Sequence, residues 1–224
     1  MPRIIRTSTN GMSDQAQVDA YVAQDRQGLI DTYIAQILVA TSKSGYIRIA
    51  DLGCGCGDYY KAFTQAFPQA TFVGYDASIP MITASADRIN VDGVTGVSLV
   101  NSIFPDALLP VNDADLVVSA FCLNQLTNPI DFWNTVKQIA KTDAEVFIWD
   151  MIRIDDAAIC TTIINSATPE CSAQFALDFQ SALQASFLLE EVQQQLVEAS
   201  LPNLQVQTIN MDAYWQIIII SGKI

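Results

Sequence analysis

Two kinds of hydrophobic spacing alternate along the first two thirds of the chain. Short apolar runs predict strands that are buried on both faces, because such strands need no polar alternation. These runs occupy residues 46–52, 70–75, 97–100, 116–120 and 144–150. Segments with apolar residues at helical spacing lie among them, at 59–67, 80–90 and 130–141. This alternation predicts a parallel sheet with helices on both faces.

The two ends of the chain carry different patterns. We expect residues 1–12 to be a loose lead-in, followed by a helical segment over 13–40 that breaks near Gly28. After the fifth strand, helical spacing returns at 155–166, 173–186 and 189–200. The last two apolar runs are separated by a short turn and are therefore expected to pair antiparallel, at 204–208 and 214–221.

No internal repeat or linker interrupts these patterns. We therefore expect one α/β domain over residues 1–224, with seven strands of which the last is antiparallel. Within it, 13–42 is expected to form an N-terminal helical cap and 154–186 a helical lid over a substrate.

Composition narrows the function classes. The formal net charge of −13 disfavours nucleic acid and anionic membranes as partners. The chain has no histidine, which removes the commonest general base and the commonest metal ligand. Its five cysteines are an odd number in a chain that is not small, so no disulfide framework is expected. Because the N-terminus lacks a signal-peptide pattern and no apolar run is long enough to span a bilayer, we expect a cytoplasmic protein.

One glycine-rich stretch, residues 49–58 (IADLGCGCGD), follows the first strand and precedes a helix. Glycines let the backbone take positive φ and let a ligand approach the main chain. The dinucleotide fingerprint G-x-G-x-x-G fails here, because the third glycine is replaced by Asp58 or Tyr60. A P-loop is excluded, since no Gly-Lys-Ser/Thr follows. We interpret Cys54 and Cys56 as small side chains of a crowded loop, and we expect no metal site.

The spacing that does occur, Asp51-x-Gly53-x-Gly55-x-Gly57, resembles the first motif of class I S-adenosylmethionine-dependent methyltransferases. Asp76 at the end of the second strand matches the acid that binds the ribose hydroxyls in that family. The resemblance implies a Rossmann-like three-layer sandwich and S-adenosylmethionine as cofactor. That ligand is a sulfonium without phosphate, which suits an acidic glycine loop.

The resemblance extends along the chain and implies further cofactor contacts. Cys54 lies within the first motif, and Ala77 follows the ribose acid. The segment 100–103 stands where relatives usually have an acid for the adenine amino group, whereas here the matching residues are Asn101, Ser102 and Ile103. The fourth strand resembles the motif whose end faces the methyl group, which points to Ser119. Asn124 and Gln125 occupy the place of two histidines in many relatives.

Further candidates come from the helices and the fifth strand. Arg26 in the N-terminal segment is either part of a solvated face or a partner for the methionine carboxylate. Since histidine is absent, a base must be a carboxylate such as Asp150 or Asp178, a tyrosine such as Tyr21, or water. Asp150 ends a strand, and ligands of open α/β sheets bind beyond such ends.

The sequence therefore predicts methyl transfer to an oxygen, nitrogen or carboxyl group of a small molecule. We expect it to act mainly by positioning, because a histidine base is lacking. A peptide tail stays open as the acceptor. Two other functions also stay open: a non-catalytic, methyltransferase-like interaction protein and an NAD(P)-dependent oxidoreductase. The oligomeric state is not predicted.

Overall fold

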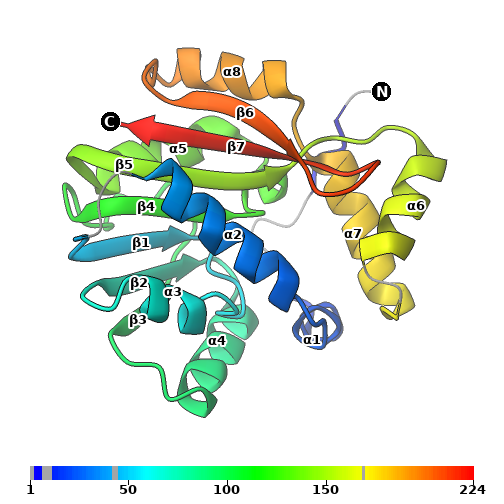
Figure 1. Ribbon diagram of the computed structural model, residues 1–224, viewed down its shortest axis with the longest axis horizontal. Helices are drawn as coiled ribbons and strands as arrows, with labels where there is room; N and C mark the ends of the chain where they lie inside the picture. The colour runs from blue at the N-terminus through cyan, green and yellow to red at the C-terminus, as the bar shows by residue number, and fades with distance from the viewer. Residues whose placement is uncertain (1–2, 7–11, 42–44, 168–169) are drawn as a thin grey trace.

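The computed structural model describes residues 3–6, 12–41, 45–167 and 170–224. Within these residues, seven strands form one sheet in the order β3-β2-β1-β4-β5-β7-β6 (Figure 1). Their bounds are β1 Arg48–Leu52, β2 Thr71–Asp76, β3 Val97–Asn101, β4 Ala114–Ala120, β5 Ala140–Met151, β6 Gln205–Asn210 and β7 Gln216–Lys223. All neighbours run parallel except β7, which is antiparallel to β5 and β6. The predicted mostly parallel sheet with an antiparallel last strand is confirmed.

Helices cover both faces of this sheet. α2 (Gln27–Ala40), α3 (Tyr60–Ala66) and α4 (Ile79–Val91) pack on one face, and α5 (Pro129–Ile139) and α8 (Leu189–Glu198) pack on the other. The isoleucines of β7 pack alternately into the hydrophobic layers on the two faces of the sheet, because successive side chains of a strand point to opposite faces. Ile217 and Ile219 belong to the first layer, whereas Ile218 and Ile220 belong to the second. The predicted three-layer sandwich is thus confirmed.

Three helices and a short 3₁₀ turn stand beyond the carboxyl ends of the central strands (Figure 1). They are α1 (Gln15–Val22), η1 (Leu123–Gln125), α6 (Ala157–Ala167) and α7 (Ala173–Ala185). α1 packs against α7, where the rings of Tyr21 and Phe175 lie 6.1 Å apart. In this way the helical segments expected at the N-terminus and after the fifth strand lie next to each other.

The N-terminal helical segment is divided into two helices as expected, but the break falls at residues 23–26, just before Gly28. The Asp25 carboxylate accepts the backbone N–H of Gln27 at 3.0 Å, where α2 begins. Such a local cap satisfies a donor that the first helical turn leaves free. Gly28 therefore lies inside α2 and does not end a helix.

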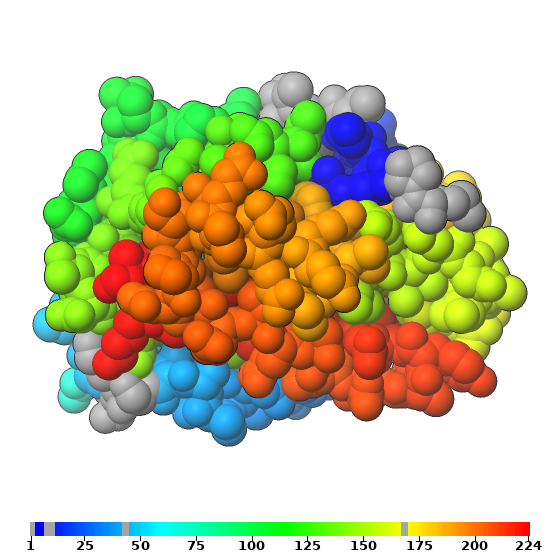
Figure 2. Space-filling model, turned by 90° about the horizontal axis from the view of Figure 1, so that it is seen from above, coloured from blue at the N-terminus to red at the C-terminus, as the bar shows by residue number. Residues whose placement is uncertain are grey.

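Residues 3–6 are docked, which contradicts the expected loose lead-in. The Ile4 N–H donates to the Gln184 carbonyl at 3.3 Å, and Arg3 Nε donates to the Ala185 carbonyl at 2.6 Å. In Figure 2 this blue segment lies between the green of the β4–α5 region and the gold at the end of α7. Residues 7–11 lie outside the described residues. None of the described helices has the length and apolar character needed to cross a membrane.

Candidate active site

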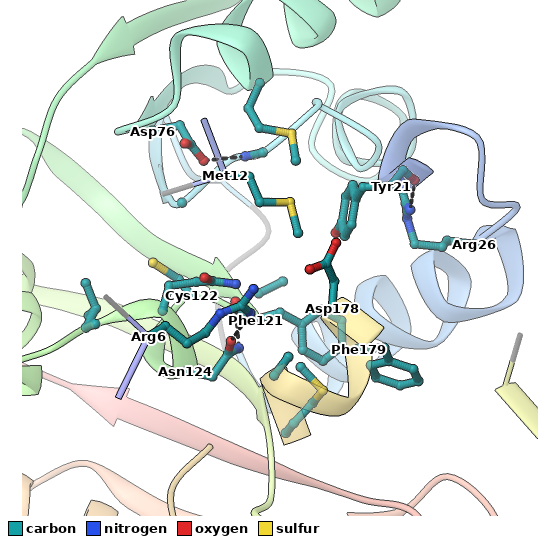
Figure 3. Close-up of a pocket in the computed structure, with 18 of the residues that line it drawn as sticks. Arg6, Met12, Tyr21, Arg26, Asp76, Phe121, Cys122, Asn124, Asp178 and Phe179 are labelled. Carbon is teal, nitrogen blue, oxygen red and sulfur yellow. Dashed lines mark hydrogen bonds between the residues drawn. The ribbon is translucent and has the colours of Figure 1, made fainter. Parts of the chain in front are cut away.

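A cavity of about 830 Å³ lies at the carboxyl ends of β1, β2 and β4, enclosed by α1, α2 and α7 (Figure 3). This is the edge at which open α/β sheets bind ligands, and the volume is typical of small-molecule sites. The sheet contributes the glycine loop and Asp76, and η1 contributes Asn124. The helices contribute Tyr21 and Asp178.

The glycine loop takes a backbone that side chains disfavour. Gly53, Gly55 and Gly57 have φ of 78°, 53° and 72°. A Cβ added at Gly53 would lie 2.6 Å from the Cys122 sulfur, so this glycine allows close packing against the turn after β4. A Cβ added at Gly55 would meet nothing within 4 Å, because this residue borders the cavity. The loop therefore leaves its backbone accessible to a ligand at Gly55.

Asp76 is tied to the same loop. Its Oδ2 accepts the Gly55 N–H at 2.9 Å (Figure 3), and its Oδ1 accepts the Ser78 N–H at 2.8 Å. Burial raises the pKa of this carboxyl group, while the two N–H donors partly offset the effect. A carboxylate has about four acceptor positions. Both oxygens of Asp76 can therefore accept one more hydrogen bond from a ligand in the cavity.

Of the predicted cofactor residues, seven line the cavity: Gly53, Gly55, Asp76, Ala77, Ser102, Ile103 and Arg26. The other five lie behind its wall: Asp51, Cys54, Gly57, Asn101 and Ser119. Their contacts explain the difference. Ser119 Oγ donates to the Leu52 carbonyl at 2.6 Å, and Asn101 Nδ2 donates to the Asp76 carbonyl at 2.9 Å. Ser119 and Asn101 therefore support the backbone of the strand ends, and direct contact of the five residues with a ligand stays a prediction.

Asp51 is buried beneath the glycine loop. Burial raises the pKa of its carboxyl group to about 7, with a partial offset from the nearby Tyr60 hydroxyl and a further rise from Asp76. Gly74 opposite lacks a side chain, and a Cβ there would lie 2.9 Å from the Cys54 sulfur. The small residues of this region therefore permit tight packing, which agrees with interpreting Cys54 as a space-saving side chain.

Asp150 does not line the cavity. Its carboxylate accepts the N–H of Leu123 at 2.7 Å, the side-chain amide of Asn124 at 3.2 Å and the N–H of Met151 at 2.8 Å. The same Asn124 amide donates to the carbonyl of Phe121 at 2.9 Å, and Phe121 has a φ of 57°. Asp150 thus holds the strained turn after β4, and this role differs from the contact with substrate that the sequence predicts.

Arg26 lines the cavity but is already paired. It forms an ion pair with the buried carboxylate of Asp58 and lies 3.9 Å from the centre of the Tyr21 ring. It also donates to the Tyr21 carbonyl and to the Cys56 sulfur. Burial opposes its charge, but Tyr21 and Asp58 more than compensate and raise its pKa. Arg26 therefore fastens α1 and the start of α2 to the glycine loop, and its predicted pairing with a methionine carboxylate stays untested.

The two remaining catalytic candidates face each other from α1 and α7 (Figure 3). Asp178 accepts amide N–H groups from Gln17 at 3.0 Å and Gln174 at 3.1 Å. Burial raises the pKa of Tyr21, so its phenol stays protonated near neutral pH. Tyr21 and Asp178 can therefore offer a proton donor and an acceptor to one ligand.

Sequence reasoning missed Arg6, Met12, Cys122 and Asn124 as cavity residues. Arg6 and Met12 lie in the stretch that was expected to be a loose lead-in. Cys122 and Asn124 follow β4, and the sequence analysis assigns neither of them a role, although Asn124 occupies the place of a histidine in many relatives. Only the departure from the usual histidines could have drawn attention to Asn124.

Acidic groups outnumber basic ones around the cavity. Among the described residues that line it, five are aspartates (Asp25, Asp76, Asp131, Asp178 and Asp212) and two are arginines (Arg6 and Arg26). In the part of the chain that the structure describes, no group of three or more His, Cys, Asp or Glu side chains is arranged to hold a metal ion. An acidic lining favours a ligand with cationic character over a polyphosphate.

Comparisons with known proteins agree with this geometry. Residues 50–146 match the family described as "Methyltransferase domain". A trans-aconitate 2-methyltransferase from Mycolicibacterium gilvum (strain PYR-GCK) is 38% identical over 69 residues, which are 31% of this chain and 27% of that protein. The match thus spans about a quarter of the curated relative.

Solved structures share the whole fold. A SAM-dependent methyltransferase from Aquifex aeolicus superposes with a TM-score of 0.69 at 18% identity, covering 93% of this chain and 98% of that one. The plantazolicin methyltransferase BpumL, solved with a triazolic desmethylPZN analog and SAH, gives a TM-score of 0.68 at 13% identity and covers 93% and 90%. At these identities the likeness concerns the fold. The predicted family resemblance, fold and cofactor class are consistent with all of these matches.

Proposed function

We propose that this chain, whose residues 50–146 match the family described as "Methyltransferase domain", is a class I S-adenosylmethionine-dependent methyltransferase that transfers a methyl group from that cofactor to a small molecule. One observation carries the proposal. The open glycine loop and the Asp76 carboxylate converge on one cavity at the carboxyl ends of the strands. Asp76 has acceptor capacity for a ribose diol, and Gly55 leaves room for a ligand beside the main chain.

The described residues fit this cofactor. The described residues that line the cavity include several carboxylates and no lysine, and both features suit a sulfonium ligand better than a phosphate-bearing one. When bound, S-adenosylmethionine supplies an electrophilic methyl group. Asp76 would hold its ribose, Ala77, Ser102 and Ile103 would lie by its adenine, and Gly53 and Gly55 would border its amino acid part.

The chain's own contribution is mainly positioning and the exclusion of water. Residues 154–186 would form a lid over the substrate. This role is supported by α7, which brings Phe175, Asp178 and Phe179 to the cavity. With no histidine in the chain, an acceptor that is already nucleophilic or mildly acidic needs little base catalysis. Tyr21 and Asp178 would then orient the acceptor by hydrogen bonds.

The similar proteins carry names that point to different acceptors. The curated relative is named for trans-aconitate, and the structural neighbour BpumL was solved with a desmethylPZN analog. We favour a small molecule here because the cavity is bordered on several sides by α1, α2, α7 and residues 3–6. An oxidoreductase is disfavoured, since the glycine spacing lacks the third glycine of a dinucleotide site.

Calorimetry with S-adenosylmethionine, S-adenosylhomocysteine and NAD tests the cofactor. We expect both sulfur compounds to bind and NAD not to bind, and NAD binding alone would refute the proposal. Release of S-adenosylhomocysteine with a panel of acceptors then separates an enzyme from a non-catalytic relative. A pH–rate profile that shows an essential base with a pKa near 7 would contradict catalysis by positioning.

A further inference from the structure

Arg6 differs from the other arginine of the cavity in how little it is paired. A guanidinium carries five N–H donors. The hydrogen bond found for Arg6 among the described residues runs from Nη1 to Asn124 Oδ1 at 3.5 Å, which is long for such a bond. Arg26, in contrast, is held by Asp58, Cys56 and the Tyr21 carbonyl. Most donors of Arg6 are therefore available to a ligand.

The backbone next to Arg6 is anchored, so its side chain enters the cavity from a fixed point. Arg3 donates to the carbonyls of Ala185 and Leu126, each at 2.6 Å, and its guanidinium lies 4.0 Å from the centre of the Phe187 ring. Figure 3 shows the Arg6 side chain reaching in beside Asn124 and Phe121. A side chain in this position belongs to the wall of the cavity.

Nothing among the described cavity residues neutralises Arg6. Asp178 attracts it, but no ion pair joins the two side chains among the described residues, and the Asp178 carboxylate accepts the amide N–H groups of Gln17 and Gln174. Burial lowers the pKa of Arg6, as expected for a guanidinium that has lost water without gaining a close anion. A planar guanidinium is matched best by an anion that takes two parallel N–H···O bonds.

We propose that Arg6 binds a carboxylate of the methyl acceptor, so that the substrate is a small carboxylic acid. This inference rests on the proposed methyl transfer. A carboxylate is favoured over a phosphate because five aspartates line the same cavity and would repel a dianion more strongly. The acceptor is favoured over the cofactor as the source, because Arg6 lies beside Asn124 and Phe121 and is attracted by Asp178, whereas the Asp76 carboxylate that would hold the ribose lies apart from it (Figure 3).

The test compares wild type with Arg6→Gln, Arg6→Lys and the control Arg48→Gln. Arg48 pairs with Asp113 and does not line the cavity. S-adenosylhomocysteine affinity is measured first by calorimetry. Carboxylic acids, their carboxamides and phosphate esters are then titrated into the loaded protein, and methyl transfer to each is followed by S-adenosylhomocysteine release. Thermal unfolding checks that every variant is folded.

We expect an acid to bind and react while its amide does not, because only the acid offers two anionic oxygens. Arg6→Gln should raise the KM for that acid by about tenfold to a hundredfold, as for the loss of a hydrogen bond to a charged group. The affinity for S-adenosylhomocysteine should stay within about twofold. The KM of Arg6→Lys for the acid should lie between those of wild type and Arg6→Gln, since lysine keeps the charge but lacks the planar guanidinium. Arg48→Gln should behave as wild type.

Several results would overturn the inference without touching the proposed function. A tenfold loss of S-adenosylhomocysteine affinity in Arg6→Gln would assign Arg6 to the cofactor. A loaded wild type that prefers amides, amines or phosphate esters, or that binds no acid of the panel more tightly than its amide, would refute a carboxylate acceptor. Wild type that fails to bind S-adenosylhomocysteine at all would instead refute the proposed methyltransferase.

Discussion

Asp76 offers the sharpest test of how the cavity holds its cofactor. Its two oxygens accept N–H groups at 2.9 and 2.8 Å from the main chain, and each can take one ribose hydroxyl as well. A hydrogen bond to a charged group contributes about 1.5–3 kcal/mol. Losing both ribose contacts in Asp76→Ala should therefore weaken binding by about 3–6 kcal/mol, or roughly two to four powers of ten in Kd.

Asp76→Asn keeps one acceptor oxygen and should lose about half of that free energy. Calorimetric titration with S-adenosylhomocysteine measures both variants. The matched control is Asp92→Asn, because Asp92 lies at the end of α4 near Lys61 and does not line the cavity. Its affinity should equal that of wild type.

A ligand change separates ribose contacts from damage to the loop. A 2′,3′-dideoxy analogue of S-adenosylhomocysteine should bind wild type and Asp76→Ala with similar affinity. The analogue has no ribose hydroxyls, so it cannot form the two contacts with Asp76 in either protein. If Asp76→Ala weakens the analogue as much as the parent compound, Asp76 acts through the Gly55 loop. A folded Asp76→Ala variant with wild-type affinity for the parent compound would refute the reasoning altogether.

Three further substitutions probe the surroundings of the cavity. Gly53→Ala should lower the free energy of unfolding by about 1–3 kcal/mol and weaken cofactor binding, because the new methyl group meets Cys122. Gly28→Ala, inside α2, should instead raise the free energy of unfolding by about 0.5–1 kcal/mol, and urea unfolding measures both variants. Burial raises the pKa of Asp51 to about 7 from 3.8, so stability from its protonated form is complete below about pH 4 and is lost as the pH rises through about 7. Wild type should thus lose more stability between about pH 5 and about pH 8 than Asp51→Asn does, and equal losses would contradict this. Asp150→Ala leaves three N–H donors without their acceptor and should cost about 2–5 kcal/mol of stability, while S-adenosylhomocysteine affinity should change less than about tenfold; a stable variant with abolished turnover would restore a catalytic role.

The sheet could be predicted because its information is local. Each buried strand is a short apolar run, and the helices between the strands force a parallel arrangement. The glycine loop and Asp76 could be predicted for the same reason, since both belong to one strand–loop–helix–strand unit. The break before α2 lies a few residues before Gly28, because the Gln27 N–H donates to the Asp25 carboxylate where α2 begins, and the glycine alone does not reveal this contact.

The remaining parts of the site depend on contacts between distant segments. Asp150 ends a strand in the expected place, but its carboxylate turns toward the donors of η1 rather than toward the cavity. Arg26 has the expected position and yet is paired with Asp58. Arg6 meets Asn124 across a separation of 118 residues, and its own segment has no hydrophobic period to announce it. Side-chain direction of this kind follows from packing, which sequence spacing alone does not contain.

Residues 3–6 also bear on the order of events during synthesis. They leave the ribosome before every strand of the sheet, but the carbonyl that accepts the Arg3 Nε hydrogen bond belongs to Ala185, 182 residues later. Contacts between such distant residues form slowly, because a long loop of chain must close first. β1, β2 and β4 can pair once residue 120 has emerged, whereas the wall that carries Arg6 must wait for α7. The newborn sheet therefore forms the glycine loop before it can enclose a substrate.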